Sequence, residues 1–224
     1  MRMDIKNPLY QKQGLHVLAT IFTIDKGNVK VLLIKRKNEP FKGKWGLVGG
    51  AVYNNETLDN AMRREIYEKT SLKDINILKA NIFDEIDRSP IFRMVCISYI
   101  GIIDSKKVEI NKITAKTENA DWFDIHKVSN LAYDGDEILK KNLETLKTKI
   151  LKTDILKNFY SGYFTIPELQ KTYEVILEKK LDRRNFRKKL LNLLEPIGKE
   201  VKLNGNKPAN LYKFKEKITE ENVL

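Results

Sequence analysis

The chain has 224 residues, of which 42% are hydrophobic, and its formal net charge is +12. The apolar fraction is sufficient for a buried core, which excludes a disordered chain, and no apolar run is long enough to span a bilayer. The single cysteine, Cys96, excludes an internal disulfide and is typical of a reducing compartment. We therefore expect a globular cytoplasmic protein with no membrane partner, whose positive charge favours a polyanionic partner.

The N-terminal residues predict a β-hairpin and a further strand. Residues 16–24 and 29–34 are rich in β-branched and aliphatic side chains, and the turn between them fits a hairpin. A loop is predicted over 37–44, and a strand over 45–50 that ends in two glycines. His16 is predicted to be an ordinary strand residue rather than a metal ligand, because no second metal-type side chain lies near it in the sequence.

The stretch from Gly49 to Leu72 predicts one amphipathic helix that follows a polar turn. Apolar side chains recur every three or four residues, and Thr57 can cap the start of the helix. Glu65 and Glu68 lie three residues apart and project from one face, with Glu56 at the helix entrance. Because hard cations prefer grouped carboxylate oxygens, this pattern predicts a site for Mg²⁺.

The same stretch resembles the Nudix box, G-x5-E-x7-R-E-U-x-E-E-x-G-U, where U is aliphatic. The resemblance implies a mixed sheet flanked by helices. It also implies hydrolysis of nucleoside diphosphates linked to another group, with divalent metal held by glutamates that an arginine supports. The metal ligands carried over in this way are Gly50, Glu56, Glu65 and Glu68, and the catalytic residues are Arg64, Glu65 and Glu68.

Two residues depart from the box. Lys69 stands where the second glutamate of the pair belongs, so it removes a ligand and adds a positive charge beside the site. We therefore expect weak Mg²⁺ binding and vestigial catalytic residues. Ser71 replaces a glycine expected to end the helix in a left-handed conformation, which costs a serine roughly 1 kcal/mol.

Beyond the helix, residues 75–86 and 91–103 predict two strands joined by a turn, and residues 120–123 predict a short aromatic strand. Cys96 lies in an apolar run, which favours a core position over a nucleophilic role. Trp45 and Trp122 could stack a nucleobase, with core packing as the favoured alternative. Three cationic residues on predicted loops could bind a diphosphate effector: Arg36, Lys37 and Arg88.

Residues 136–160 keep helical spacing, with a predicted break at Thr153–Asp154. No Gly/Pro linker follows, so we expect two domains held in a defined relation, with a boundary between residues 150 and 151. Residues 1–150 contain 26 Lys+Arg and 20 Asp+Glu, and residues 151–224 contain 16 and 10. Each part therefore has a net charge of +6, and the shorter C-terminal part has more net positive charge per residue.

The C-terminal part predicts a helix-turn-helix with a β-hairpin wing. Residues 165–168 have the spacing of a capping box and begin a helix that ends near Leu177. Asp182 can cap a second helix, which extends to Leu193 with an apolar face and basic remaining faces. The hairpin is predicted from 199–203 and 211–214, with a turn at Asn204–Gly205. The predicted DNA-binding residues are Arg183, Arg184, Asn185, Arg187, Lys188, Lys189 and Lys207. A small solvated helical appendage remains the alternative.

Segments 164–170, 181–189 and 207–214 resemble the winged-helix half of prokaryotic Nudix-related transcriptional regulators, so that the resemblance covers nearly the whole chain. It implies an α+β protein with a Nudix domain followed by a small winged-helix domain. It further implies a homodimer that binds operator DNA and senses ADP-ribose or a related nucleotide or sugar metabolite. An active Mg²⁺-dependent Nudix hydrolase of ADP-ribose-like compounds remains the second hypothesis, because Glu56, Glu65 and Glu68 are all present.

Overall fold

The computed structural model describes residues 8, 11–152, 155–160, 162–202 and 208–216. Its N-terminal part is a seven-stranded sheet with strand order β3-β2-β1-β6-β5, in which β4 also pairs with β1 and β7 with β2. Strands β1 and β6 are parallel, whereas the other pairs are antiparallel, so the sheet is mixed as predicted. The strands are β1 (Gly14–Asp25), β2 (Asn28–Arg36), β3 (Trp45–Gly46), β4 (Val48–Ala51), β5 (Ile77–Phe83), β6 (Met94–Ile102) and β7 (Thr117–Asp124).

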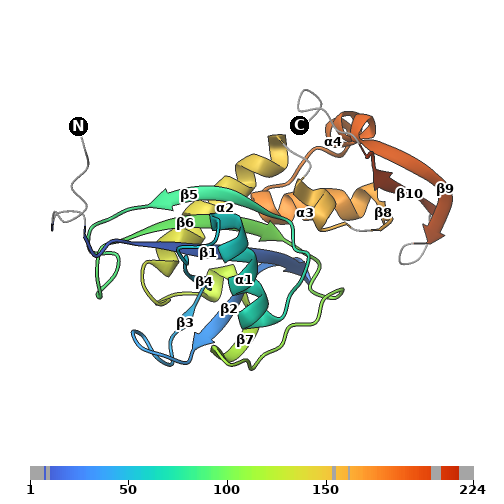
Figure 1. Cartoon of the computed structure of the whole chain (residues 1–224). Helices are drawn as coiled ribbons and strands as arrows, with labels where there is room; N and C mark the ends of the chain where they lie inside the picture. Colours follow the sequence, from blue (N-terminus) through green and yellow to red (C-terminus); the bar gives the residue numbers. More distant parts are fainter. Residues whose placement is uncertain (1–7, 9–10, 153–154, 161, 203–207, 217–224) are drawn as a thin grey trace.

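Helices α1 (Leu58–Thr70) and α2 (Gly135–Lys152) cover opposite faces of this sheet (Figure 1). The alternation of apolar side chains along β1 explains why both faces of the sheet are covered by a helix. Val17, Ala19 and Ile21 pack in one core cluster with residues of α1, whereas Leu18 and Phe22 pack in the other with residues of α2. Because successive strand residues point to opposite faces, one apolar strand serves both layers.

A buried polar network joins α2 to the sheet. Asn142 is fully buried, and its amide nitrogen donates to the hydroxyl of Thr20 at 3.1 Å. Its amide oxygen accepts from Ser98 at 2.9 Å and from Asn81 at 2.8 Å. Buried polar groups need partners, so this network specifies how α2 sits on β1, β5 and β6.

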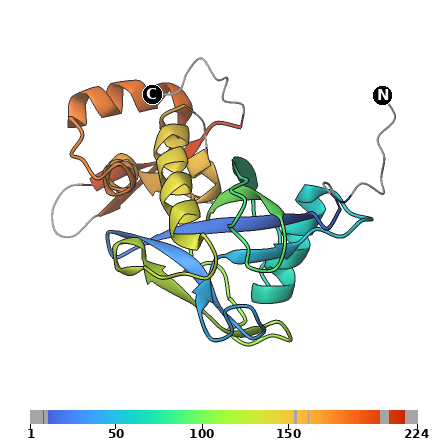
Figure 2. The same cartoon turned by 90° about the vertical axis from the view of Figure 1, so that its left-hand side faces the viewer.

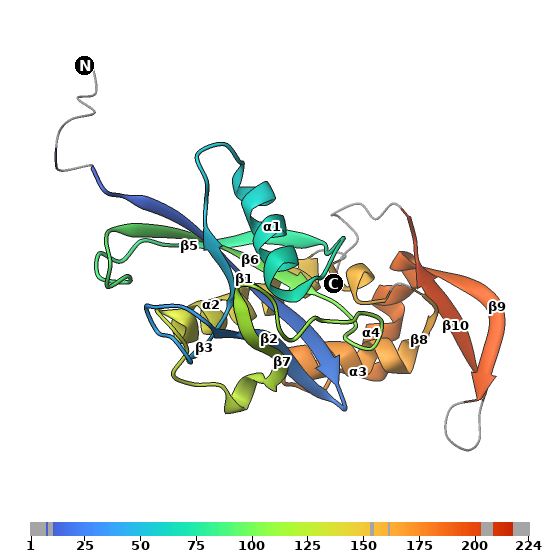
Figure 3. The ribbon, with the colours of Figure 1, turned by 60° about the horizontal axis from the view of Figure 1, so that its bottom comes forward.

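The C-terminal part is a winged helix, and its wing extends away from the sheet (Figure 3). Its apolar side chains continue the core cluster of α2, which extends from the sheet towards this part (Figure 2). A 3₁₀ turn over Ile155–Asn158 lies between the two parts. The elements are β8 (Phe164–Thr165), α3 (Ile166–Leu177), α4 (Arg183–Leu190), β9 (Leu194–Lys202) and β10 (Pro208–Phe214). This architecture confirms the predicted α+β class.

Several predicted boundaries were wrong. Residues 45–50 form two strands rather than one, because β3 pairs with β2 whereas β4 pairs with β1, and the chain changes partner at Leu47. Strands β5 and β6 are shorter than predicted, and β9 is longer. Helix α4 ends at Leu190 and is followed by a 3₁₀ turn over Leu191–Leu193. Strand β8 was not predicted.

Other predictions remain untested. The predicted helix break at Thr153–Asp154 and the wing turn at Asn204–Gly205 lie outside the described residues. The domain boundary between 150 and 151 falls within the last turn of α2 and stays a prediction. Among the described residues, no helix combines the length and apolar character needed to cross a membrane.

Candidate effector site and DNA-binding helix

The Nudix-box helix has the predicted caps. The hydroxyl of Thr57 accepts from the backbone amide of Asn60 at 3.2 Å, and Ser71 ends the helix with a left-handed φ of 61°. The glycine pair lets strand and helix approach closely. A Cβ on Gly50 would lie 2.5 Å from the Glu65 carboxylate, and one on Gly49 would overlap the carbonyl of Val17. A larger residue at Gly50 would therefore push α1 away from β4, and a larger residue at Gly49 would push β4 away from β1.

Arg64 joins the three box carboxylates. Its guanidinium donates to Glu56 at 2.6 and 2.9 Å, to Glu65 at 2.5 Å and to Glu68 at 3.2 Å. It also donates to the carbonyl of Ala51 at 2.9 Å, and it lies 3.9 Å from the ring centroid of Tyr53. The sequence prediction that these carboxylates converge is confirmed, and the arginine supports them as the resemblance implied.

These contacts shift the ionisation of the site. Hydrogen bonds from Arg64 lower the pKa of Glu56 to about 2. Burial alone would raise the pKa of Glu65, but the positive charges of Lys69 and Arg64 hold it below its ordinary value. Hydrogen bonding to Glu56 raises the pKa of Arg64. Glu56 and Glu65 are therefore ionised at neutral pH, and their charge is compensated from within the protein.

Lys69 extends into the same site. Its side chain is 11% exposed, its ammonium lies 3.0 Å from Oε2 of Glu65, and it donates to the backbone carbonyl of Gly49. Burial lowers the pKa of Lys69, and the Glu65 carboxylate acts against that shift. Lys116 forms a second ion pair, 2.5 Å from Glu68. Every box carboxylate therefore has an internal cation as its partner.

A divalent metal does not fit this arrangement. Mg²⁺ requires oxygen ligands at about 2.0–2.1 Å with near-octahedral geometry. Oxygens of Glu56, Glu65 and Glu68 instead accept hydrogen bonds from Arg64 and Lys116. The remaining buried oxygen, Oε2 of Glu65, accepts no hydrogen bond from the described residues and lies 3.0 Å from the Lys69 ammonium. Binding a metal would place two further positive charges beside these cations. Whether the Gly50 carbonyl can act as a ligand stays a prediction.

A cleft of about 430 Å³ opens beside this helix. Four cations line it, and two carboxylates, so the cleft is complementary to an anion. Its charged lining residues are Arg36, Lys37, Glu39, Glu65, Lys69 and Lys116.

The structure places two of the three predicted effector-binding residues in the cleft, namely Arg36 and Lys37. The third, Arg88, is not among its lining residues. The Arg88 side chain is 1% exposed and donates to both carboxylate oxygens of Asp134 at 2.8 and 2.9 Å. The expectation that Arg88 lies at the surface was therefore wrong, because its guanidinium is buried in an ion pair with Asp134. A contact between Arg88 and an effector stays a prediction that requires this pair to open.

Among the lining residues that were not predicted for the cleft, three carry polar or charged groups that bear on its chemistry. Tyr133 packs against the guanidinium of Arg36, with 5.1 Å to the ring centroid. His16 lies in β1 as expected but also lines the cleft, and burial lowers its pKa to about 3. Lys116 precedes β7. These residues are far apart in the sequence. The pairing of β1 with β2 and of β2 with β7 brings His16 and Lys116 to the cleft, and the loop before α2 brings Tyr133.

The alternative roles in the core are confirmed for three residues. Cys96 is fully buried, and burial raises its pKa to about 12, which excludes a reactive thiolate at neutral pH. Trp45 packs edge-to-face on Phe123 at 4.5 Å between ring centroids. Trp122 packs against the α1-side cluster, and neither tryptophan lines the cleft.

Helix α4 has the form expected of a DNA-reading helix. Asp182 caps it by accepting from the amide of Asn185 at 2.8 Å. Phe186 and Leu190 are buried against the rest of the winged helix. The six predicted DNA-binding residues on this helix are all exposed: Arg183, Arg184, Asn185, Arg187, Lys188 and Lys189. The seventh, Lys207, lies outside the described residues.

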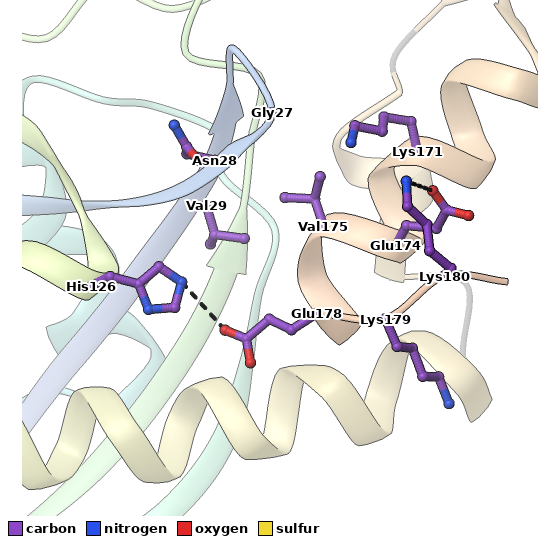
Figure 4. Close-up of a pocket in the computed structure, with 10 residues that line it drawn as sticks. All are labelled: Gly27, Asn28, Val29, His126, Lys171, Glu174, Val175, Glu178, Lys179 and Lys180. Atoms are coloured by element: carbon purple, nitrogen blue, oxygen red, sulfur yellow. Dashed lines mark hydrogen bonds and ion pairs between the residues drawn. The ribbon is translucent and has the colours of Figure 1, made fainter.

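A second cavity, of about 240 Å³, lies between the two parts (Figure 4). Asn28, Val29 and His126 line it from the sheet side, and residues of α3 and the following turn line it from the other. Glu178 ends α3 in a left-handed conformation with φ of 54°. Its carboxylate lies 3.3 Å from Nε2 of His126 and 2.6 Å from Nζ of Lys147 on α2. We call this contact region the seam.

Comparison with known proteins gives matches to two family models, the NUDIX domain over residues 14–146 and the NrtR DNA-binding winged helix domain over residues 157–214. The chain is 28% identical over 219 residues to the ADPR responsive transcriptional repressor NtrR of Acinetobacter baylyi, covering 95% of this chain and 84% of that protein.

Two solved structures are also similar. Shewanella oneidensis NrtR in complex with a 27mer DNA has 29% identity and a TM-score of 0.79, covering 90% of this chain and 93% of that one. The NUDIX domain of the same protein, in complex with ADP ribose, has 27% identity and a TM-score of 0.57, covering 62% and 93%. With its box helix, its cleft and its basic second helix, the chain belongs to the Nudix family and carries an NrtR-type winged helix domain after its Nudix domain.

Proposed function

We propose that this protein is a transcription regulator, a repressor, that binds operator DNA through its winged helix and senses ADP-ribose or a related metabolite in a degenerate Nudix domain. The observation that carries the proposal is the exposed basic face of α4, in a chain similar over 90% of its length to a structure in complex with DNA. Exposed Arg and Lys on a helix neutralise phosphates, and Arg184, Asn185 or Arg187 can reach base edges in the major groove.

The cleft supports the effector role. Its cations are complementary to a diphosphate, and the similar NUDIX domain of Shewanella NrtR was solved with ADP ribose. The box carboxylates around Arg64 and Lys69 are paired with cationic side chains and do not form an open metal site. We therefore propose binding without efficient hydrolysis, and Glu65, Glu68 and Arg64 act in structure rather than catalysis.

We propose that ADP-ribose releases the protein from its operator. Among the described residues, α2, the 3₁₀ turn Ile155–Asn158, α3 and α4 contribute to one apolar core cluster, so a ligand can bias the orientation of the recognition helix. Adding ADP-ribose to a preformed operator complex should lower DNA affinity about 5- to 150-fold. Because coupling is reciprocal, saturating operator should lower ADP-ribose affinity by the same factor.

Fluorescence anisotropy of labelled operator and calorimetric titration of the ligand measure the two affinities. AMP release in the presence of Mg²⁺ is measured in parallel. Tight ligand binding that leaves DNA affinity unchanged would contradict the regulator. Turnover above roughly 1 per second would support the hydrolase instead.

We further propose a homodimer in the cytoplasm, with separate domains on either side of the boundary between residues 150 and 151. A dimer presents two recognition helices to two half-sites about 34 Å apart. Strand β5 lies at the edge of the sheet, and its Ile82 is 68% exposed, with Ile86 just beyond it 80% exposed. Edge strands with exposed apolar residues are pairing surfaces.

Light scattering of the unaltered protein should therefore give about twice the chain mass, and Ile82→Lys should shift the mass towards that of a monomer. Lys79→Glu on the same strand changes charge without removing apolar surface and should leave the dimer intact. A monomeric unaltered protein would contradict the dimer.

A further inference from the structure

The Lys69 ammonium lies among oxygen atoms of the Nudix-box motif. Lys69 follows Glu65 by four residues, so the two side chains share one face of α1. Packing of that face against β4 brings the ammonium to the backbone carbonyl of Gly49. One side chain thus contacts both a box carboxylate and the glycine-pair backbone, the two kinds of oxygen donor that a cation would draw from this motif.

This ammonium is part of the cleft wall. Lys69 lines the cleft together with the Glu65 carboxylate that it neutralises. An ammonium has three N–H donors, and the Gly49 carbonyl accepts from one of them, whereas Oε2 of Glu65 is an ion-pair partner at 3.0 Å that accepts no hydrogen bond within the described part of the chain. The remaining donors can serve a ligand in the cleft.

Three other cationic side chains lie around the same space as the Lys69 ammonium. Arg36, Lys37 and Lys116 line the same space from β2, the loop that follows it and the residue before β7. A diphosphate in Nudix chemistry is an anion that metal normally neutralises. Here the fixed side chains supply the positive charge, and charge-assisted hydrogen bonds from such groups are the strong ones.

We infer that Lys69 substitutes for the divalent cation, so that this protein binds the diphosphate group of its effector without metal. The inference rests on the proposed function for the choice of ligand. It adds that binding is independent of Mg²⁺ and that Lys69 is the residue responsible.

The first test is metal binding without any ligand. Titration of Mn²⁺ into the unaltered protein, followed by electron paramagnetic resonance, should show no site with a Kd below about 1 mM, since each carboxylate already has a cationic partner. Lys69→Glu restores the acidic pair and should create a Mn²⁺ site at least 10-fold tighter. Lys73→Glu makes the same charge change on the exposed side of the helix end and should not.

The second test is calorimetric titration of ADP-ribose in EDTA and in 5 mM Mg²⁺. For the unaltered protein the two Kd values should agree within about twofold. Lys69→Gln should weaken binding in EDTA about 10- to 100-fold, the effect of losing one charge-assisted contact. Lys69→Glu should bind measurably only with Mg²⁺. Circular dichroism confirms that each variant is folded.

The outcomes distinguish the role of Lys69 from the proposed binding of ADP-ribose. Binding that requires Mg²⁺ in the unaltered protein, or a tight Mn²⁺ site in it, overturns the role of Lys69 while leaving the regulator intact. Absence of ADP-ribose binding under both conditions overturns the proposed effector, whereas the Mn²⁺ result still decides whether Lys69 blocks the metal.

Discussion

Replacing Arg183, Arg184 and Arg187 by alanine is expected to weaken operator binding by at least about 100-fold, because each arginine contributes a phosphate contact or a base contact of about 1–3 kcal/mol. All three side chains are exposed on α4, whereas Phe186 and Leu190 hold the helix in place. The substitutions should therefore leave the fold unchanged. The slope of log affinity against log salt should fall by about 0.9 for each phosphate that the variant no longer neutralises.

A triple variant with the same charge change is the control. Lys73, Lys127 and Lys140 are exposed residues outside the winged helix, and their replacement by alanine removes three positive charges. The control should retain most of the specific affinity, since it changes only the long-range field. Equal losses in the two variants would show that net charge, rather than α4, accounts for binding.

Replacing Arg64 by methionine is expected to destabilise the protein by about 3 kcal/mol at neutral pH. Methionine keeps the apolar length of the side chain but leaves the buried carboxylate of Glu65 with one cationic partner fewer. Breaking a buried pair by removing one partner costs about 3–5 kcal/mol, and the partial exposure of Arg64 places the expected cost at the lower end. Urea unfolding measures the loss.

The effect should depend on pH. Carboxylates with a lowered pKa contribute stability above the pKa of the unfolded chain, near 4.3, and lose it as the pH falls through the folded value. For Glu56 the folded pKa is about 2. The stability difference between the two proteins should therefore be largest above pH 5 and shrink towards pH 2. Arg63→Met, one residue away on the exposed side, should lower the free energy of unfolding by less than about 1 kcal/mol. A similarly small loss for Arg64→Met would contradict the structural role of Arg64 as the shared partner of the three box carboxylates.

Local sequence patterns predicted the local structure well. Thr57, Thr165 and Asp182 each cap the helix that follows them, because an N-cap depends only on a few neighbouring residues. The convergence of Glu56, Arg64, Glu65 and Glu68 was also predictable, since α1 and its entry turn alone bring these residues together. The position of Lys69 pointed correctly to an altered metal site.

Long-range contacts could not be predicted in the same way. The donation from Lys69 to Gly49 depends on how closely α1 packs on β4, which the glycine pair permits but does not indicate. Tyr133 and Lys116 reach the cleft from a loop and a strand start far along the chain. Arg88 was predicted to be a surface residue because its partner, Asp134, lies 46 residues away. The two-residue strand β8 exists only as a partner of β10, so no local pattern marks it.

The pairing of β2 with β7 connects the cleft to the seam. Arg36 and the neighbouring Lys116 line the cleft at one end of the pair, and Asn28 and the neighbouring His126 line the cavity of the seam at the other. Nine extended residues of β2 span about 26 Å at roughly 3.3 Å per step. A rigid ribbon of this length that pivots by about 5° at the cleft moves its far end by about 2 Å. That displacement exceeds the range of distances that a hydrogen bond tolerates, so the 3.3 Å contact between His126 and Glu178 would have to break or carry α3 with it.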